Sequence, residues 1–399
     1  MSPGRAASGE QGDCSPSDAT IADDARFLAL ALELALLGQG QTRPNPMVGS
    51  VVVRNGEIIG KGHHPKAGQD HAENRALADA GGDARAATLY TNLEPCAHQG
   101  RTPPCTDAII RGGTKRVVAC LRDPDPRVNG KGFAALEEAG IEVNVGLLAE
   151  EARKLNEAYF HYLGTGRPFV TVKAGSSLDG RIAAPRREGQ AAAGSPLWVT
   201  SPQAREEAMR LRGRNDAVLV GIGTVLEDDP LLSVRDPASP RPILRAVLDS
   251  GLRTPPACRL LGSLQEGPVV IYHTQGAAAQ HAAALRAAGA ETVAAGKGAR
   301  VDLDLVLEDL GRREILALLV EGGGEVIGSF LSRGLVDRIC LFLAPSFLGA
   351  RAVPLVGSAA ARPGGRKEEE THPELPLRLD SFTVIRVGSD LLIEGSPSR

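Results

Sequence analysis

Strand-like and helix-like segments alternate along this 399-residue chain in two blocks, and this alternation limits the folds open to it. In the first block, short apolar runs predict strands at 47–53, 57–62, 86–92, 115–120 and 141–145. Amphipathic segments predict helices at 24–37, 72–80, 104–111 and 131–139. Such alternation is typical of a layered α/β domain with mostly parallel strands. Asn55-Gly56, between the first two runs, predicts a tight hairpin.

The second block repeats the pattern and predicts a second α/β domain. Its strand-like runs lie at 168–175, 216–221, 242–249, 268–272, 315–324, 337–345 and, as the last strand, 377–388. Helices are predicted at 202–212, 278–288, 303–311 and 324–333. A polar helix at 150–163 joins the blocks, so we expect domains over 24–147 and 168–399 with a linker over 148–167. The charged, Pro- and Gly-rich stretch 361–376 predicts an exposed loop.

Composition narrows the class of function. Lys and Arg total 45 against 48 Asp and Glu, a formal charge of −3, which offers no basic field for gathering nucleic acid. No run of about 18 apolar residues is present, so no membrane span is expected. Residues 1–23 are small and polar, which predicts a disordered tail rather than a secretory signal. Six cysteines in a chain this long make a poor disulfide framework, which favours a cytoplasmic protein.

Three potential metal ligands lie in the first block. His71, Cys96 and Cys105 offer one imidazole and two thiolates, the donors that zinc prefers, and leave a fourth position for water, as catalytic zinc sites do. Zinc lowers the pKa of bound water from about 16 towards 7. Glu73 follows the histidine closely and can carry the water's proton to a departing amine, the role of the His-x-Glu and Pro-Cys motifs in zinc deaminases.

Other interpretations of these residues stay open on the residues alone. A His-x-Glu pair arises by chance at the polar start of many surface helices. A structural zinc site would need a fourth protein ligand, a role for which His98 can be considered. The commonest deaminase signature also places about two residues between its cysteines, whereas eight lie between Cys96 and Cys105.

Longer motifs carry a more specific signal. The first block contains HPKAGQDHAENRAL, TNLEPCAHQGRTPPCTDAII and RDPDPRVNGKG. The second block contains KAGSSLDGRIA, WVTSPQAREEAMRLR, VGIGTVLEDDPLLSVR and LVEGGGEVIGSFL. Together these motifs closely resemble the bifunctional deaminase/reductase family of riboflavin biosynthesis, which has this wide cysteine spacing. The resemblance covers nearly the whole chain from residue 24 onward. It implies a cytidine-deaminase-like domain followed by a dihydrofolate-reductase-like domain.

The same resemblance implies two consecutive reactions on phosphoribosylated pyrimidines. In the first, zinc-dependent hydrolysis removes an exocyclic amine from a diaminopyrimidinone as ammonia. In the second, NADPH reduces the ribosyl group of the resulting aminouracil to ribityl. Zn²⁺ and NADPH are therefore the cofactors expected, small molecules are the expected partners rather than nucleic acid or a membrane, and a homo-oligomer is allowed.

The resemblance also implies roles for individual residues. In the first domain it implies zinc ligation by His71, Cys96 and Cys105, proton transfer by Glu73, and substrate contacts by Asn45, His64 and Arg101. In the second domain it implies catalysis by Lys173 and Glu321, binding of the substrate phosphate by Arg212 and Arg235, and further substrate contacts by Leu232 and Glu321. Contacts to NADPH are implied for Gly175, Trp198, Thr224, Asp228, Ser250, Gly323, Gly324, Glu325, Val326, Ile327, Gly328 and Ser329.

Simpler interpretations exist for several of these residues. Asn45 can pair with a pyrimidine edge, yet between two prolines it also suits a turn. Arg101 can hold a phosphate or simply be solvated. The glycines at 322–324 can let helix N–H groups approach a pyrophosphate or can make a tight turn. Trp198 suits a core as well as a cofactor contact.

The chain departs from the family pattern at three places. The family often has Lys where Arg101 stands and Asn where Asp125 stands, and the aspartate adds negative charge to a substrate loop. Pro196 replaces a residue that commonly supplies a hydroxyl, with Ser195 as the neighbouring substitute. Three further functions stay open: a deaminase whose second half only stabilises the assembly, a structural zinc protein, and a polynucleotide deaminase, which the charge balance disfavours.

Overall fold

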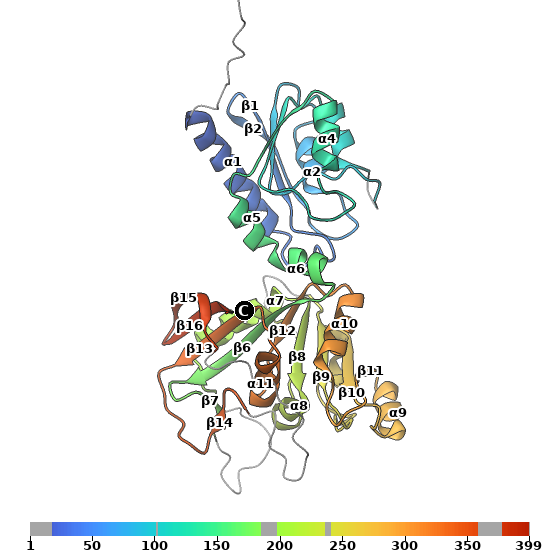
Figure 1. The fold of residues 1–399 in the computed structure, drawn as a ribbon, viewed down its shortest axis with the longest axis vertical. Coiled ribbons are helices and arrows are strands. Elements are labelled where there is room, and N and C mark those ends of the chain that lie inside the picture. The colour runs from blue at the N-terminus through green and yellow to red at the C-terminus, as the bar shows by residue number, and fades with distance from the viewer. Residues whose placement is uncertain (1–17, 101–102, 185–197, 236–240, 358–376, 399) are drawn as a thin grey trace, which may run out of the picture. The chain divides into compact units, whose positions relative to one another are not determined.

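The computed structural model describes residues 18–100, 103–184, 198–235, 241–357 and 377–398, which form two compact units (Figure 1). The first unit extends to Asn156 and the second begins at Glu157, with the short segment Arg43–Asn45 grouped with the second. The division falls inside the stretch 148–167 expected to be a linker. Among the described residues, no helix has the length and apolar character needed to cross a membrane.

The first unit is built on a five-stranded sheet in the order β2-β1-β3-β4-β5. Its strands are β1 (Gly49–Arg54), β2 (Glu57–His63), β3 (Thr88–Thr91), β4 (Arg116–Ala119) and β5 (Glu142–Val145). Its helices are α1 (Asp18–Leu36), α2 (Ala72–Asp79), α3 (Cys105–Arg111), α4 (Lys131–Glu138) and α5 (Ala149–Leu155). The predicted α/β class is confirmed.

The prediction of mostly parallel strands is wrong for half of this sheet. β3, β4 and β5 run parallel, but β1 is antiparallel to both β2 and β3. The predicted hairpin at Asn55-Gly56 is present, with φ of 54° and 79° at its two residues, and so short a connection joins only antiparallel strands.

The expected disordered tail is wrong for residues 18–23, which form the start of α1; residues 1–17 lie outside the described residues. The cause is a tertiary anchor in the next turn of the helix. Asp24 is buried, accepts from Tyr90 Oη at 2.8 Å, and pairs with Arg116 at 2.7 Å. With this turn fixed against the sheet, the preceding polar residues only have to extend an existing helix, which costs much less than nucleating one.

The predicted single helix at 150–163 is two helices, α5 and α6 (Glu157–Thr165), separated at Asn156. The side chain of Asn156 is turned to the backbone of Met47, accepting from its N–H and donating to its carbonyl, both at 2.8 Å. Asn92 donates to the same carbonyl at 3.0 Å. This long-range pairing of a buried side chain with a loop backbone interrupts a helix that the local pattern would continue.

The second unit contains a nine-stranded sheet in the order β11-β10-β9-β8-β12-β6-β13-β16-β15 and a small β14-β7 ladder. The strands are β6 (Phe169–Ser177), β7 (Arg181–Ala183), β8 (Ala217–Gly221), β9 (Leu244–Leu248), β10 (Val269–His273), β11 (Glu291–Ala294), β12 (Ala317–Val320), β13 (Arg338–Ala344), β14 (Val353–Pro354), β15 (Leu379–Val387) and β16 (Asp390–Pro397). Besides α6, its helices are α7 (Pro202–Gly213), α8 (Ile222–Asp228), α9 (Ala279–Ala287), α10 (Leu303–Arg312) and α11 (Gly324–Ser332), with a 3₁₀ turn, η1 (Leu261–Glu266).

Several elements of this unit were not predicted. The last strand is β16 and not the segment at 377–388, which forms β15 and pairs with β16 as an antiparallel hairpin. α8 follows β8 without a break, at a position where no helix is predicted. β11 is only four residues long, and its exposed outer positions hide the strand pattern. The expected loop at 361–376 lies outside the described residues.

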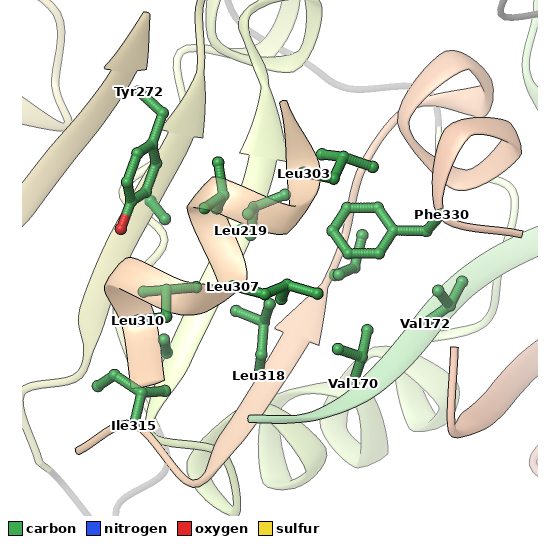
Figure 2. Packing of buried hydrophobic residues seen from close by; sticks show 14 of the residues in the cluster. Val170, Val172, Leu219, Tyr272, Leu303, Leu307, Leu310, Ile315, Leu318 and Phe330 are labelled. Atoms are coloured by element: carbon green, nitrogen blue, oxygen red, sulfur yellow. The ribbon is translucent and has the colours of Figure 1, made fainter. Parts of the chain in front are cut away.

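The main core of the second unit packs helices onto the central strands. Figure 2 shows Leu303, Leu307 and Leu310 of α10 gathered beside Leu219 and Leu318 of the sheet, all at most 4% exposed. Aliphatic side chains at three- and four-residue spacing along α10 give it one continuous apolar face.

This core fixes the parallel strands whose carboxyl ends position the functional residues. From β11 through β13 every neighbouring pair runs parallel. The chain passes from β8 outward to β11 and then returns to place β12 between β8 and β6. In open α/β sheets, ligands bind outside the carboxyl ends of strands where the strand order reverses in this way.

Candidate active sites

Two short segments bring the three potential metal ligands of the first unit together. His71 is the N-cap of α2, and Cys105 is the first residue of α3. Cys96 lies on the loop after β3, where Cys105 N donates to its sulfur at 3.5 Å. Gly62 of β2 allows α2 to pack closely, because a Cβ on this residue would lie 2.3 Å from the carbonyl oxygen of Ala72.

The geometry of these three side chains fits a bound zinc ion. Nδ1 of His71 lies 3.2 Å from Sγ of Cys105 and 3.5 Å from Sγ of Cys96, and all three ligand atoms lie within 4.8 Å of one another. A tetrahedral zinc ion with Zn–N of about 2.0 Å and Zn–S of about 2.3 Å separates nitrogen and sulfur by about 3.5 Å. The side chains therefore already stand at the separations that such an ion requires.

The electrostatics of the cluster point to metal binding and proton transfer. A hydrogen bond from Cys105, helped by His71, outweighs burial and lowers the pKa of Cys96 to about 4. The hydrogen bond to Cys96 and burial raise the pKa of Cys105, so without a metal the two thiols retain one proton between them. A divalent cation bound between them would displace that proton.

Glu73 stands beside the cluster as a buried carboxyl group. Its side chain is 3% exposed, and Oε2 lies 3.5 Å from Sγ of Cys105. Burial raises the pKa of Glu73 to about 7, although the nearby His71 opposes the shift. A carboxyl group that changes protonation state near neutral pH can both accept and release a proton during a reaction.

Glu94 is a functional candidate that the sequence did not single out. Its buried carboxylate accepts hydrogen bonds of 2.9 to 3.3 Å from four backbone N–H groups, those of Asp123, Gly130, Gly132 and Phe133. Glu94 thereby ties the loop that holds Cys96 to residues 123–130 and to the start of α4. The only sequence signal was its place in the LEPC motif.

The residues expected to contact the substrate in the first unit differ in where the structure places them. His64 is 2% exposed, its ring centroid lies 5.2 Å from that of His71, and its Nδ1 lies 3.2 Å from the carbonyl oxygen of Asp70. Burial lowers the pKa of His64, so the ring is neutral at neutral pH. Asn45 groups with the second unit, and Arg101 lies outside the described residues. Asp125 is buried and binds Arg127 through both carboxylate oxygens.

In the second unit, Lys173 and Glu321 meet at the carboxyl end of β12. Val172 of β6 pairs in register with Val320 of β12, so the next residue on each strand, Lys173 and Glu321, lie side by side. Nζ of Lys173 is 3.7 Å from Oε2 of Glu321. The predicted pair of catalytic candidates is therefore brought together by strand register.

Arg212, which was expected to bind the substrate phosphate, forms an ion pair with Glu321 instead. Its Nε and Nη2 donate to the two carboxylate oxygens, both at 2.9 Å, and its Nη1 donates to the carbonyl of Ser233 at 2.9 Å. Burial opposes ionisation of Glu321, but Arg212 and Lys173 outweigh it and lower its pKa to about 2. Glu321 is therefore a permanent carboxylate at neutral pH.

The other expected substrate contacts lie on one loop after α8. Leu232 is 4% exposed, and Arg235 is exposed, with its backbone N–H donating to Sδ of Met209 at 3.3 Å. This places Arg235 near α7, the helix that also carries Arg212. The expected Ser195 and Pro196 contact lies outside the described residues.

The residues expected to contact NADPH lie mainly beyond the carboxyl ends of the parallel strands. Ser250 follows β9, Thr224 and Asp228 lie in α8 after β8, and residues 324–329 open α11 after β12. Ser250 Oγ accepts from the backbone N–H of Val301 at 3.2 Å. Trp198 is not a core residue: it is 61% exposed, with Arg205 over its ring at 4.8 Å. Gly175 of β6 packs against Thr200.

The glycines after Glu321 differ in what surrounds them. A Cβ at Gly324 would lie 2.4 Å from the carbonyl oxygen of Pro354, and one at Gly328 would lie 2.3 Å from that of Gly357. These two glycines are thus required by protein packing. Gly323, the N-cap of α11, faces open space and is the position where a ligand can approach the helix N-terminus.

Comparison with known proteins agrees with both halves of this arrangement. Residues 21–121 match the cytidine and deoxycytidylate deaminase zinc-binding region, and residues 168–392 match the RibD C-terminal domain. The riboflavin biosynthesis protein RibD of Aquifex aeolicus is 42% identical over 370 residues, covering 93% of this chain and 97% of that protein. RibD of Escherichia coli is 40% identical over 341 residues, covering 82% and 89%.

Solved structures show the same two-part fold. RibD of Acinetobacter baumannii superposes with a TM-score of 0.80 at 33% identity, covering 95% of this chain and all of that one. A deaminase/reductase from Thermotoga maritima gives 0.78 at 34% identity, again over 95% of this chain and 100% of that one. The chain therefore belongs to the RibD family, the bifunctional deaminase/reductases of riboflavin biosynthesis.

Proposed function

We propose that the chain deaminates 2,5-diamino-6-(phosphoribosylamino)pyrimidin-4-one and then reduces the ribosyl group of 5-amino-6-(phosphoribosylamino)uracil to ribityl. The Thermotoga maritima structure bears the names of these two activities. The observation that carries the proposal is the presence of both sites in one chain: His71, Cys96 and Cys105 around one point, and Lys173 beside Glu321 at another.

In the deaminase half, His71, Cys96 and Cys105 would hold zinc, the cofactor of this family's first domain. When bound, zinc supplies a Lewis acid that makes a water molecule acidic near neutral pH. Glu73 takes the proton of the attacking water and delivers it to the amine, so that oxygen replaces nitrogen at the ring carbon and ammonia leaves. Its buried position and raised pKa suit both transfers.

Recognition of the pyrimidine in this half is assigned to His64, Asn45 and Arg101. His64 is supported by its buried position beside His71, where Nδ1 of the neutral ring donates to the carbonyl of Asp70 and Nε2 is therefore an acceptor. Asn45 and Arg101 rest on the family resemblance, the first for the pyrimidine edge and the second for the phosphate.

In the reductase half, bound NADPH would supply the hydride that reduces C1 of the ribosyl group. Opening the sugar then requires a proton on the ring oxygen as the bond from C1 to that oxygen breaks. Lys173 is the donor we assign, since its Nζ lies 3.7 Å from Oε2 of Glu321 and its side chain is 20% exposed. Glu321 orients Lys173, and Arg212 keeps Glu321 ionised.

Cofactor and substrate contacts follow the carboxyl ends of the strands. Gly323 and the first turn of α11 are assigned to a phosphate of NADPH, with Ser250, Thr224, Asp228, Trp198 and Gly175 as further contacts. Leu232 and Arg235 are assigned to the substrate. Because Arg212 is occupied by Glu321 and Ser233, we assign the substrate phosphate to Arg235 first.

A homo-oligomer and a cytoplasmic location stay predictions. The edge strand β15 gives the oligomer physical support, because Phe382, Val384 and Ile385 are each at least half exposed there. Apolar side chains on an unpaired edge strand favour pairing with a second chain.

One experiment tests the whole proposal on the purified full-length protein. The diaminopyrimidine substrate and NADPH are supplied together, and ammonia release and NADPH oxidation are followed in parallel. We expect both ammonia release and NADPH oxidation. Once the aminouracil intermediate has been used up, one mole of NADPH should have been oxidised for each mole of ammonia released. Ammonia release without NADPH oxidation would instead favour a deaminase whose second half only stabilises the protein.

A further inference from the structure

A fully buried arginine lies beneath the substrate loop of the reductase half. Arg245, in the middle of β9, is 0% exposed. Its hydrogen-bond acceptors among the described residues are neutral carbonyls and one hydroxyl, and its Nε has no acceptor there. Glu266 acts on this charge only at longer range, and a buried guanidinium that hydrogen-bonds no carboxylate is costly, so a side chain of this kind calls for an explanation.

The acceptors of Arg245 come from two separate segments. Nη1 donates to the carbonyl of Leu260 at 3.3 Å and to Oγ of Ser263 at 2.9 Å, and Nη2 donates to the carbonyls of Ser263, at 2.9 Å, and Gly267. These residues surround η1. Nη1 also donates to the carbonyl of Leu231 at 3.0 Å. Arg245 therefore joins the η1 segment to the loop 229–235, which follows α8.

The residue after Leu231 has a strained backbone. Leu232 has φ of 55°, in the left-handed region that a residue with a side chain occupies only at an energetic cost. Such a conformation persists when its surroundings hold it in place. Here the carbonyl before Leu232 binds Arg245, and the carbonyl after it, that of Ser233, binds Arg212 at 2.9 Å. Two arginines thus bind the backbone carbonyls of the residues before and after Leu232.

We propose that Arg245 is a positioning residue for the reductase substrate loop, acting through the carbonyl of Leu231 to hold Leu232 and Arg235 where the substrate binds. The inference rests on the proposed function, which assigns Leu232 and Arg235 to the substrate. Arg212 links the same loop to Glu321, so the loop is fixed at one side to the catalytic carboxylate and at the other to β9.

A role confined to packing η1 is the competing explanation, and the two differ in what they predict. Loss of packing alone would lower the stability of the unit and would change the KM for the substrate, the KM for NADPH and the turnover rate together. Loss of loop positioning would raise the KM for the aminouracil substrate selectively, because NADPH is assigned to other segments. The deaminase half supplies an internal control on the same chain.

The test compares Arg245→Met and Arg245→Lys with the unchanged full-length protein, using preformed aminouracil substrate and NADPH. Arg245→Met is expected to raise the substrate KM by about tenfold or more, which corresponds to about 1.4 kcal/mol of lost binding. The KM for NADPH and the rate of ammonia release should stay within about twofold of those of the unchanged protein. Arg245→Lys, which retains a donor, should restore part of the substrate affinity.

Arg338→Met is the matched control. Arg338 is a largely buried arginine of the same unit, but its carboxylate partners, Glu157 and Glu394, belong to α6 and β16 and not to the loop. This variant is expected to lower stability without changing the substrate KM. If Arg245→Met does not fold, Arg245→Lys serves as the test, with a smaller but still selective rise in the substrate KM.

Arg235→Gln separates failure of this inference from failure of the proposed function. An unchanged substrate KM in the Arg245 variants, together with a raised one in Arg235→Gln, would overturn the role of Arg245 alone. Equal changes in both KM values would also overturn it, in favour of packing. An unchanged KM in Arg235→Gln would show that the loop does not bind the substrate, and both assignments would fall.

Discussion

Arg212 donates to both carboxylate oxygens of Glu321 at 2.9 Å each, and this fork sets the charge of the reductase site. With Lys173 on the other side, the carboxylate stands between two cations and its pKa falls to about 2 in spite of burial. An ionised Glu321 cannot donate a proton, so we assign proton donation in this site to Lys173.

The lowered pKa of Glu321 predicts how stability depends on pH. Below its usual pKa of 4.5, the unfolded chain binds a proton at this residue that the folded chain does not. The stabilisation is thus fully present above about pH 5 and is lost as the pH falls towards 2; it is on the order of 3 kcal/mol. Urea unfolding followed by circular dichroism should show a smaller loss of stability on acidification in Glu321→Gln than in the unchanged protein.

Glu137→Gln, at an exposed carboxyl group of α4, controls for the loss of a carboxylate elsewhere. It should follow the pH dependence of the unchanged protein. The same dependence in Glu321→Gln would mean that Glu321 is not held as an ion in the folded state.

Lys173→Ala is expected to stop reduction while sparing deamination. Glu321 retains its two bonds to Arg212, so the fold of the second unit should survive the change. Loss of a positioned proton donor typically costs about 10²- to 10⁴-fold in rate. NADPH oxidation with preformed aminouracil and ammonia release from the diaminopyrimidine are measured on the same sample. Reduction at the normal rate would place the donor elsewhere.

Glu73→Gln is expected to have the reverse effect. The amide retains the shape of the side chain but cannot take the proton of water, so ammonia release should fall by at least about 10²-fold. The metal content should be unchanged, because Glu73 lies beside the ligands and is not one of them. NADPH oxidation with preformed aminouracil checks that the second half is intact. Loss of the metal together with the activity would argue that Glu73 supports the ligands instead.

Glu94 is expected to control the order of the Cys96 loop. Removing its carboxylate leaves four backbone N–H groups without their acceptor, and each buried unpaired group costs about 1–3 kcal/mol. Thermal stability and bound metal should decrease in the order unchanged protein, Glu94→Gln, Glu94→Ala, because the amide retains one acceptor oxygen. Reduction of preformed aminouracil is the control. A Glu94→Ala protein with full metal content and unchanged stability would refute this role.

Local patterns in the sequence predicted what depends on local structure. The hairpin at Asn55-Gly56, the alternation of strands and helices, and the placement of His71 and Cys105 at the starts of two helices all follow from short segments. The α/β class, the two activities and their cofactors are confirmed by the fold and by the comparisons.

Features that depend on side chains reaching distant backbone groups could not be predicted. Glu94 binds N–H groups 29 to 39 residues away, and Asn156 binds Met47 across 109 residues. Nothing in the sequence near either residue specifies its partner. The same holds for Arg212, whose arginine–phosphate role was expected from the family but whose guanidinium lies on Glu321 across 109 residues.

Metal content measured together with deaminase activity tests the central claim most directly. Elemental analysis of the purified protein should find about one zinc ion per chain, retained in Glu73→Gln and lost, with ammonia release, in Cys96→Ser and Cys105→Ser. NADPH oxidation with preformed aminouracil should persist in all three variants. Full ammonia release from protein with no bound transition metal, or zinc retained after both cysteines are replaced, would contradict the site formed by His71, Cys96 and Cys105.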